Sequence, residues 1–265
     1  MSWQQRFRRG KRHMRSKEAH WVVLFGGADR EGVVEALLGA GVDVTAVLVP
    51  ERRSARLEHS VQALREMPTR VIEVDRSAAE DYLTSCPEAA LLSVGFPYVI
   101  GGHVLATRQT RLNVHPTLLP HYRGPTSGAY QIMDGQTESG STVHVMESEV
   151  DTGAIVAQSR VKLDRFDTVR SVQRKVYETE PGLLLEALAL IDGGAEPVPQ
   201  TTGSVFPRRG PKDSEIDPNI SLVDLYDTIR SCDPEDYPAF FFVDGEKVCV
   251  RIWRPDKPPG EEDRV

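Results

Sequence analysis

The chain has 265 residues, 40% of them hydrophobic, which fits one large domain or one domain with a small appendage. It has no apolar run near the ~20 residues that a membrane span needs, no apolar stretch typical of a secretory signal at its start, and no CxxC pair among Cys86, Cys232 and Cys249. The lack of long apolar runs argues against a membrane protein and a secreted protein, and the cysteine spacing argues against a disulfide framework and a metal site. The net charge of −7 argues against a nucleic-acid partner. We therefore expect a cytoplasmic protein.

Positive charge is concentrated at the start of the chain. Residues 1–20 contain seven Lys or Arg and one Glu, a net of +6, which leaves −13 for residues 21–265. We predict a basic, disordered N-terminal extension over 1–20, with contact between this tail and nucleic acid as the alternative. The pattern of the remaining chain predicts a main domain over 21–200 and a small C-terminal subdomain over 201–265.

The first half of the body alternates strands with helices. Residues 21–25 are apolar and β-branched, Gly26-Gly27 follow as a turn, 33–38 have helical spacing, and 42–49 are again apolar, which predicts a βαβ unit. Further strands are predicted at 71–74, 89–94 and 112–114, and helices near 54–66, 77–85 and 101–107. This order predicts an α/β fold with a Rossmann-like, mostly parallel twisted sheet covered on both faces. The residues after Gly26-Gly27 do not complete the dinucleotide fingerprint, so we expect no nicotinamide cofactor.

The second half predicts fewer strands and a helix–hairpin ending. Residues 168–192 have the pattern of one long helix, which Pro181 should kink or split. A helix over 221–230 with Ser221 as its cap precedes two apolar runs, 239–243 and 247–253, which flank Asp244-Gly245 and predict a hairpin. The polar residues 255–265 are expected to fray.

Two short motifs carry the residues needed to attack a carbonyl group. Asn113 and His115 lie two apart, so on an extended strand both side chains point to the same face. Asp151, which begins Asp-Thr-Gly, follows a second strand-like run at 141–146 and can reach the same point. A carboxamide, an imidazole and a carboxylate together suit a reaction with a negatively charged intermediate.

The run from 113 to 158 resembles the formyltransferases that use N10-formyltetrahydrofolate. The motifs are Asn-x-His-Pro, Leu-Leu-Pro, Tyr-Arg-Gly, Thr-Val-His and Asp-Thr-Gly, in that order and at compatible spacing. The resemblance implies a formyltransferase catalytic domain over 21–200, N10-formyltetrahydrofolate as co-substrate, and Asn113, His115 and Asp151 as the catalytic residues.

Formyl transfer to an amine passes through a tetrahedral intermediate, and the three residues fit its needs. Asn113 and His115 can donate hydrogen bonds to the oxyanion. Asp151 can favour the protonated imidazole or accept a proton from the attacking ammonium, and His115 is the expected proton source for the leaving folate nitrogen. No metal is required. His144 is interpreted as a strand residue that lines the site.

The resemblance also suggests where the two substrates bind. The folate slot is expected at the strand and loop near 93–100, after the Asn-x-His-Pro motif and in the loop before Asp151, at Ser93, Gly95, Phe96, Tyr98, Leu118 and Val150. For Phe96 and Tyr98, ordinary core packing is the alternative. Around the acceptor we expect Gly26, His121, Tyr122, Arg123, Arg208 and Arg209. Arg208 and Arg209 can bind a pyrophosphate by bidentate pairing, or can simply form an exposed basic loop.

The acceptor is predicted to be a nucleotide-linked amino sugar. The segments 206–214, 225–230 and 237–241 resemble tracts of nucleotide-sugar formyltransferases, and the chain is too short after Gly210 for the barrel usual in methionyl-tRNA formyltransferases. The alternatives are a methionyl-tRNA formyltransferase, a formyltetrahydrofolate hydrolase and a catalytically idle folate-binding module. The edges of the hairpin at 239–253 can pair across a homodimer, or the hairpin can pack on its own domain.

Overall fold

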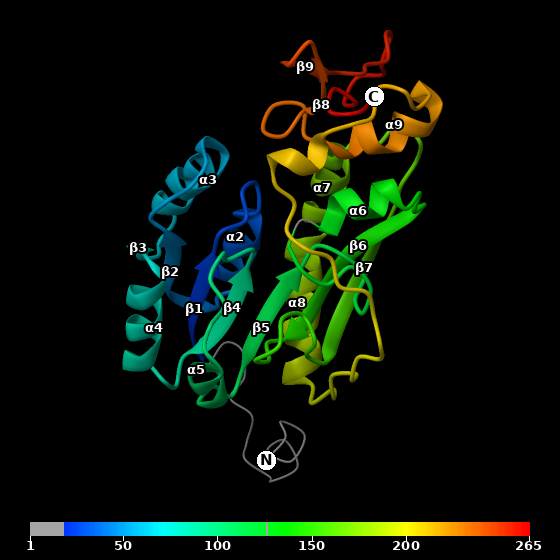
Figure 1. Cartoon of the computed structure of the whole chain (residues 1–265). Coiled ribbons are helices and arrows are strands. Elements are labelled where there is room, and N and C mark those ends of the chain that lie inside the picture. Colours follow the sequence, from blue (N-terminus) through cyan, green and yellow to red (C-terminus); the bar gives the residue numbers. More distant parts are fainter. Residues whose placement is uncertain (1–18, 126) are drawn as a thin grey trace.

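The computed structural model describes residues 19–125 and 127–265, and its centre is a seven-stranded sheet (Figure 1). The strands follow the order β3-β2-β1-β4-β5-β6-β7. Their bounds are β1 (His20–Phe25), β2 (Asp43–Pro50), β3 (Val71–Val74), β4 (Ala90–Val94), β5 (Arg111–His115), β6 (Glu138–Val145) and β7 (Ile155–Lys162). The predicted N-terminal extension falls almost wholly on residues 1–18, which lie outside the described residues.

The sheet confirms the predicted α/β fold. Strands β1 to β5 pair in parallel, whereas β6 and β7 join the β5 edge in antiparallel pairs. Strands β1, β2 and β4 are mostly buried on both faces, which explains why they are nearly continuous apolar runs in the sequence. The order changes direction between β1 and β4, and clefts in such sheets form beyond the carboxyl ends of the strands at such a point.

Helices cover both faces of the sheet. Helices α2 (Gly32–Gly39), α3 (Ala55–Arg65) and α8 (Glu180–Asp192) contribute apolar side chains to the core on one face. Helices α4 (Arg76–Ser85) and α5 (Gly102–Ala106) pack on the other. The side chains of Ser54 and Asp75 cap α3 and α4, so each helix begins where the sequence provides a hydrogen-bond acceptor.

The predicted long helix over 168–192 is two helices. Helix α7 (Val169–Tyr177) begins at a capping box formed by Thr168 and Ser171, and α8 begins three residues after α7 ends. Pro181 lies in the first turn of α8, where its missing N–H costs no hydrogen bond. The sequence analysis did not predict α6 (Ser127–Met133) or strand β7.

The predicted C-terminal helix and hairpin are both present. A 3₁₀ turn, η1 (Pro211–Ser214), is followed by α9 (Leu222–Ser231), which Ser221 caps, and by the hairpin of β8 (Ala239–Val243) and β9 (Glu246–Val250). Figure 1 shows these elements above α6 and α7.

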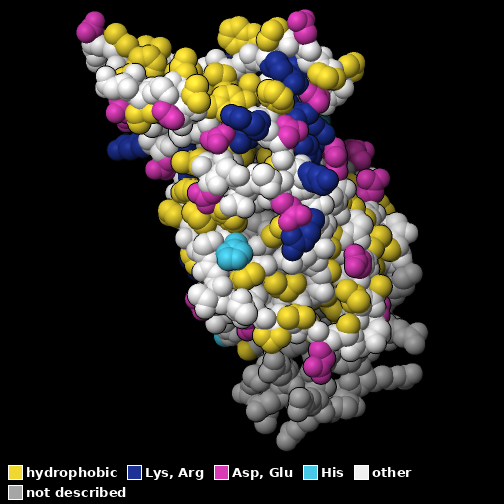
Figure 2. Space-filling model, turned by 90° about the vertical axis from the view of Figure 1, so that its right-hand side faces the viewer, with side chains coloured by type: hydrophobic (Ala, Val, Ile, Leu, Met, Phe, Trp, Pro, Cys, Tyr) yellow, Lys and Arg dark blue, Asp and Glu magenta, His cyan; other side chains and the backbone are white. Residues whose placement is uncertain are grey.

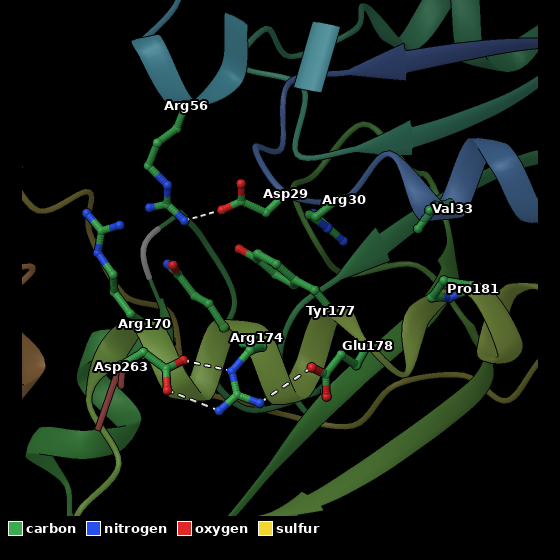
Figure 3. Close-up of a pocket in the computed structure, with 12 residues that line it drawn as sticks. Asp29, Arg30, Val33, Arg56, Arg170, Arg174, Tyr177, Glu178, Pro181 and Asp263 are labelled. Carbon is green, nitrogen blue, oxygen red and sulfur yellow. Dashed lines mark hydrogen bonds and ion pairs between the residues drawn. The ribbon is translucent and has the colours of Figure 1, made fainter. Parts of the chain in front are cut away.

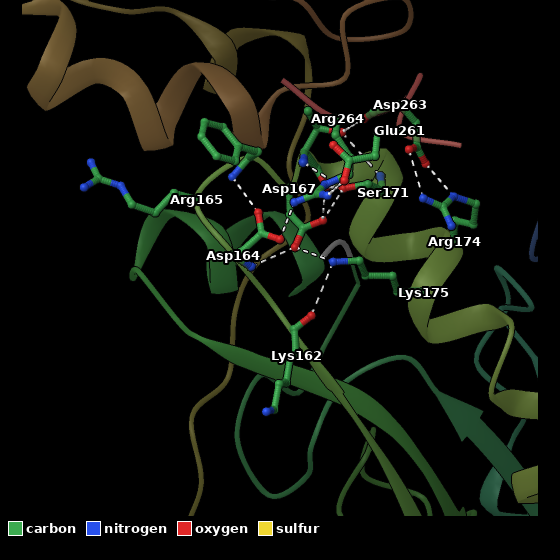
Figure 4. A network of polar contacts seen from close by, with 12 residues as sticks. Lys162, Asp164, Arg165, Asp167, Ser171, Arg174, Lys175, Glu261, Asp263 and Arg264 are labelled. Atoms are coloured by element: carbon green, nitrogen blue, oxygen red, sulfur yellow. Dashed lines mark hydrogen bonds and ion pairs between the residues drawn. The ribbon is translucent and has the colours of Figure 1, made fainter. Parts of the chain in front are cut away.

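The C-terminal segment does not fray as expected but docks against the start of α7 (Figure 4). The buried carboxylate of Asp167 accepts hydrogen bonds from Lys175 at 2.7 Å and Ser171 at 2.8 Å, and Arg264 lies 3.4 Å from it. Asp263 forms a bidentate pair with Arg174, at 2.8 and 3.1 Å. These polar contacts replace the apolar packing that this tail cannot provide.

Candidate active site

The three predicted catalytic residues meet at the carboxyl end of β5. Asn113 and His115 lie on β5, and Asp151 lies in the loop after β6. The Asp151 carboxylate is 3.5 Å from His115 Nδ1 and accepts a long hydrogen bond of 3.4 Å from the Asn113 amide. His144, which pairs with Asn113 across the β5–β6 ladder, lies 3.5 Å from the same carboxylate. The structure therefore brings a fourth side chain into the cluster.

Backbone carbonyls fix the tautomers of both histidines. His115 Nε2 lies 2.9 Å from the carbonyl oxygen of Tyr122, and since a carbonyl only accepts, this nitrogen carries a proton. In the neutral ring Nδ1 is then the unprotonated atom, and it faces Asp151. His144 Nδ1 donates to the Val145 carbonyl at 2.9 Å, which leaves its Nε2 to accept from the Asn113 amide at 3.0 Å. The sequence predicted that His144 lines the site, and its 3.0 Å hydrogen bond with the Asn113 amide shows that it also orients Asn113.

Asp151 has an unusual backbone conformation that aims its side chain inward. Its φ of 57° lies in the left-handed region, which Asp tolerates better than most residues. The Gly124 N–H donates to its carboxylate at 2.9 Å, and the Gln200 amide donates to its carbonyl at 2.9 Å. A Cβ on Gly153 would lie 1.8 Å from the Val145 carbonyl oxygen, so only glycine fits at the third position of the Asp-Thr-Gly motif.

Burial and mutual charge set the protonation of the cluster. Burial lowers the pKa of His115, although the Asp151 charge acts in the opposite direction. Burial alone would raise the pKa of Asp151, but the charge that His115 carries when protonated and the hydrogen bond from the Gly124 N–H outweigh it and hold this pKa well below its usual range. The free protein thus has an ionised Asp151 beside a neutral imidazole whose Nδ1 is open to a proton.

The residues predicted for the folate slot lie on two sides of the cluster. Ser93 is on β4 and pairs with Asn113, and Gly95 (φ 66°) follows in the turn after β4. The rings of Phe96 and Tyr98 make an edge-to-face contact at 5.3 Å. Phe96 also packs against the core on the α4–α5 face, so core packing explains part of its burial. Val150 is 50% exposed in the loop before Asp151. Leu118 instead lies against Gly140 of β6.

The residues expected near the acceptor are only partly together. The N–H groups of Gly26 and Gly27 both donate to the Val94 carbonyl, so this turn joins β1 to β4. Tyr122 holds His115 through its carbonyl, and its ring stacks on Phe206 at 5.0 Å. The two residues beside Tyr122 do not contact the cluster in the same way: Arg123 donates to the Gln200 side chain and the Thr201 carbonyl, and His121 is exposed.

Arg208 and Arg209 differ in their surroundings. Arg208 is exposed. The Arg209 guanidinium donates to the Asp213 carbonyl at 2.7 Å and lies 5.8 Å from the centre of the Tyr130 ring. These contacts connect the loop to α6 and to the C-terminal subdomain. A role for the two arginines in pyrophosphate binding stays a prediction.

A cavity of about 430 Å³ lies between the start of α2, α3 and α7, and its lining residues were not predicted from the sequence. Arg56 comes from α3, and Arg170 and Arg174 come from α7; Figure 3 shows Arg56 paired with Asp29, and Arg174 between Asp263 and Glu178. Arg30, also in its wall, donates to the Val114 carbonyl of β5. No sequence motif marks these residues, because α3 and α7 are brought together only by the fold.

Comparisons with known proteins identify the family. A family model described as formyl transferase matches residues 22–188, more than half of the chain, and the chain belongs to this family. It is 28% identical over 230 residues to a GDP-perosamine N-formyltransferase of Brucella melitensis, covering 84% of this chain and 89% of that protein.

Solved structures share the fold at lower identity. A 4-N formyltransferase from Francisella tularensis matches with a TM-score of 0.71 at 20% identity, covering 89% of this chain and 98% of the other. An N-formyltransferase from Helicobacter canadensis, in complex with folinic acid and dTDP-3-aminofucose, matches with a TM-score of 0.66 at 17% identity, covering 86% and 85%. These two likenesses show the formyltransferase fold.

The described residues also show how the chain stands with respect to membranes, metals and disulfides. Over residues 19–125 and 127–265, no helix has the length and apolar character to cross a membrane. The same residues hold no group of three or more His, Cys, Asp or Glu side chains placed to bind a metal ion. Cys86, Cys232 and Cys249 are free cysteines.

Proposed function

We propose that this protein transfers a formyl group from N10-formyltetrahydrofolate to the amine of a nucleotide-linked amino sugar. The observation that carries the proposal is the Asn113–His115–Asp151 cluster, in which a neutral Nδ1 faces an ionised carboxylate inside a formyl transferase domain. The relative from Brucella melitensis is named for a nucleotide sugar, GDP-perosamine, and supports this class of acceptor.

The Asn113 amide and His115 Nδ1 serve two different steps of the reaction. The acceptor amine attacks the formyl carbon, a C–N bond forms, and the former carbonyl oxygen takes the negative charge. The Asn113 amide is placed to meet that charge, which requires only its long 3.4 Å contact with Asp151 to be replaced. The amine loses one proton and N10 of the folate gains one when the C–N10 bond breaks. His115 Nδ1 accepts the proton of the amine and donates it to N10, because Nε2 already donates to the Tyr122 carbonyl.

The co-substrate fits beside β4 and the loop before Asp151. A flat ring system needs an apolar wall and backbone hydrogen bonds, and Phe96, Tyr98 and Val150 offer partly exposed apolar surface near the cluster. Gly95 keeps this turn free of a side chain. When bound, the folate supplies the formyl group, and the residues of this chain orient it and move the proton.

The acceptor's anionic part fits the arginine-lined cavity. Arg56, Arg170 and Arg174 present guanidinium groups that match phosphate oxygens, and the Tyr177 ring offers an apolar face. Each arginine is paired with a carboxylate in the free protein: Arg56 with Asp29, Arg170 with Asp233, and Arg174 with Asp263. A more highly charged diphosphate can displace these partners, of which Asp29 is half exposed.

The test is a mass-spectrometric assay with N10-formyltetrahydrofolate and nucleotide-linked 3-amino and 4-amino sugars. We expect one sugar to gain a single formyl group and Asp151→Asn to abolish the gain. Release of formate without any amine would instead identify a hydrolase, and formylation of methionyl-tRNA in parallel would identify the tRNA enzyme. A protein that binds the folate but formylates nothing would refute the proposal.

Two further expectations belong to this function. The exposed side chains of Phe242, Val248 and Trp253 support a homodimer through the hairpin, whereas Phe240 is buried in its own subdomain. Figure 2 shows hydrophobic side chains gathered at the upper end of the molecule, level with this hairpin. Sedimentation of the Phe242→Ser variant tests the dimer. Three free cysteines support the cytoplasmic location, since disulfides are rare there.

A further inference from the structure

A fully buried ion pair lies directly behind the catalytic strand. Arg30, in the turn before α2, donates to the carboxylate of Glu180, at the start of α8, through two hydrogen bonds of 2.6 and 2.7 Å. The side chains are 2% and 0% exposed. Neither residue has a part in the chemistry proposed above.

The pair contacts the backbone on both sides of the catalytic histidine. Arg30 Nη2 also donates to the Val114 carbonyl at 2.9 Å, and Val114 is the residue between Asn113 and His115. Glu180 lies 2.9 Å from the hydroxyl of Ser141, which is also 2.9 Å from the His115 carbonyl oxygen. The Val114 carbonyl is therefore bonded directly to the ion pair, while the His115 carbonyl and the Glu180 carboxylate share the single hydrogen of the Ser141 hydroxyl.

The same guanidinium group lies under the two glycine turns. A Cβ built on Gly27 would lie 2.6 Å from Arg30 Cδ, and a Cβ built on Gly95 would lie 3.2 Å from Arg30 Nη1. The guanidinium carbon is also 5.0 Å from the centre of the Tyr177 ring, which lines the arginine cavity. Arg30 thus contacts the turn on the acceptor side, the turn on the folate side and the strand that bears the catalytic residues.

Stability alone does not account for such a pair. Removing two charges from water costs about as much as their attraction returns, so well-packed apolar residues usually serve a core equally well. Burial alone would lower the pKa of Arg30, but the Glu180 carboxylate outweighs it and raises this pKa, so the arginine stays charged. What the pair offers beyond apolar residues is a directional hydrogen bond to the Val114 carbonyl and an acceptor that holds the Ser141 hydroxyl beside the His115 carbonyl.

We propose that Arg30 and Glu180 are positioning residues for the formyl transfer, which fix β5 so that Asn113 and His115 meet the reacting carbon while both glycine turns hold their substrates. The inference rests on the proposed function of the site. Its consequence is specific: loss of the pair leaves both substrates bound but misplaces the reacting groups, and a displacement of about 1 Å can cost on the order of 100-fold in rate.

The test is the double variant Arg30→Met/Glu180→Met, which removes both charges and leaves no unpaired ion. We expect kcat to fall about 100-fold while the dissociation constants for folate and nucleotide sugar, measured by calorimetry, stay within about twofold. The matched control is Arg53→Met/Glu73→Met, because Arg53 is 9% exposed and its ion pair with Glu73 lies by β2 and β3, at the far edge of the sheet. Its kcat should equal that of the wild type.

The other possible results with the double variant also test the proposal. An unchanged kcat in the double variant, or a loss of substrate binding that accounts for the whole loss of rate, would overturn the proposal. If the double variant fails to fold, Ser141→Ala replaces it, because this change leaves the ion pair in place and removes the hydroxyl that lies between Glu180 and the His115 carbonyl. It should lower kcat about tenfold without weakening binding.

A readout without catalysis separates this inference from the proposed function. Nitrogen-15 NMR of the His115 ring reports its tautomer and surroundings whether or not any sugar is formylated. We expect the Nδ1 and Nε2 shifts to move in the double variant and in Ser141→Ala but not in the control. Identical shifts in all four proteins would refute a positioning role, even if the wild type proved active.

Discussion

Replacing Asp151 by Asn is the most direct test of the catalytic cluster, because it changes the charge and little else. The left-handed backbone at Asp151, with φ of 57°, suits Asn as well as Asp. The Asn carbonyl oxygen can keep the 2.9 Å hydrogen bond from the Gly124 N–H. An Ala at this position would lose that bond and strain the backbone, which would confuse the interpretation.

The size of the effect follows from the 3.5 Å separation of Asp151 and His115. In the free protein the imidazole is neutral, so the charge of Asp151 matters most after Nδ1 takes the proton of the amine. At an effective dielectric constant of 20, two unit charges 3.5 Å apart attract by about 4.7 kcal/mol. That energy corresponds to about three powers of ten in rate, and the dipole of Asn recovers part of it. We expect kcat to fall about 100- to 1,000-fold.

The assay compares kcat and both dissociation constants of the wild type, Asp151→Asn and a control. Asp244→Asn is the matched control, because Asp244 also has a positive φ of 48° but lies in the exposed hairpin turn. The substrates should bind to the Asp151 variant with nearly unchanged affinity, since the charge acts mainly after proton transfer. A kcat within about threefold of the wild type would refute the assignment of Asp151 as the partner of a protonated His115.

Three further predictions concern stability and binding. Burial lowers the folded-state pKa of His115, so the wild type should lose stability as the pH falls below the unfolded-state pKa of about 6.5. Urea titrations from pH 8 to 5 should show a smaller loss of stability in His115→Gln than in the wild type. Gly153→Ala should cost about 2–4 kcal/mol and abolish activity, because its Cβ meets the Val145 carbonyl, whereas Gly182→Ala, with open space, should keep the thermal midpoint at or above that of the wild type. Arg174→Ala should raise KM for the nucleotide sugar about tenfold and leave KM for the folate unchanged. If the variant and the wild type have the same KM for the sugar, the cavity does not bind the acceptor.

Most of the sheet could be predicted from the sequence because buried parallel strands are continuous apolar runs. The strand from 71 to 74 was predicted with its observed bounds, and β1, β2 and β4 were within one or two residues of theirs. Strand β7 was missed because only one of its residues is buried and because it includes the polar residues Gln158 and Arg160. Pro181 pointed correctly to a break near it, but the actual break is set by the capping box of α7 and the proline at the start of α8.

The sequence was enough to predict that Asn113, His115 and Asp151 meet, because the first two share one face of a strand and Asp151 follows the next strand-like run. Only the tertiary structure decided which histidine nitrogen faces Asp151, because the Tyr122 carbonyl that fixes it comes from a separate loop. The arginine cavity and the Arg30–Glu180 pair were likewise invisible in the sequence. Residues 150 apart in the chain meet there through the packing of α2 and α8 on one face of the sheet, and no local pattern records such a contact.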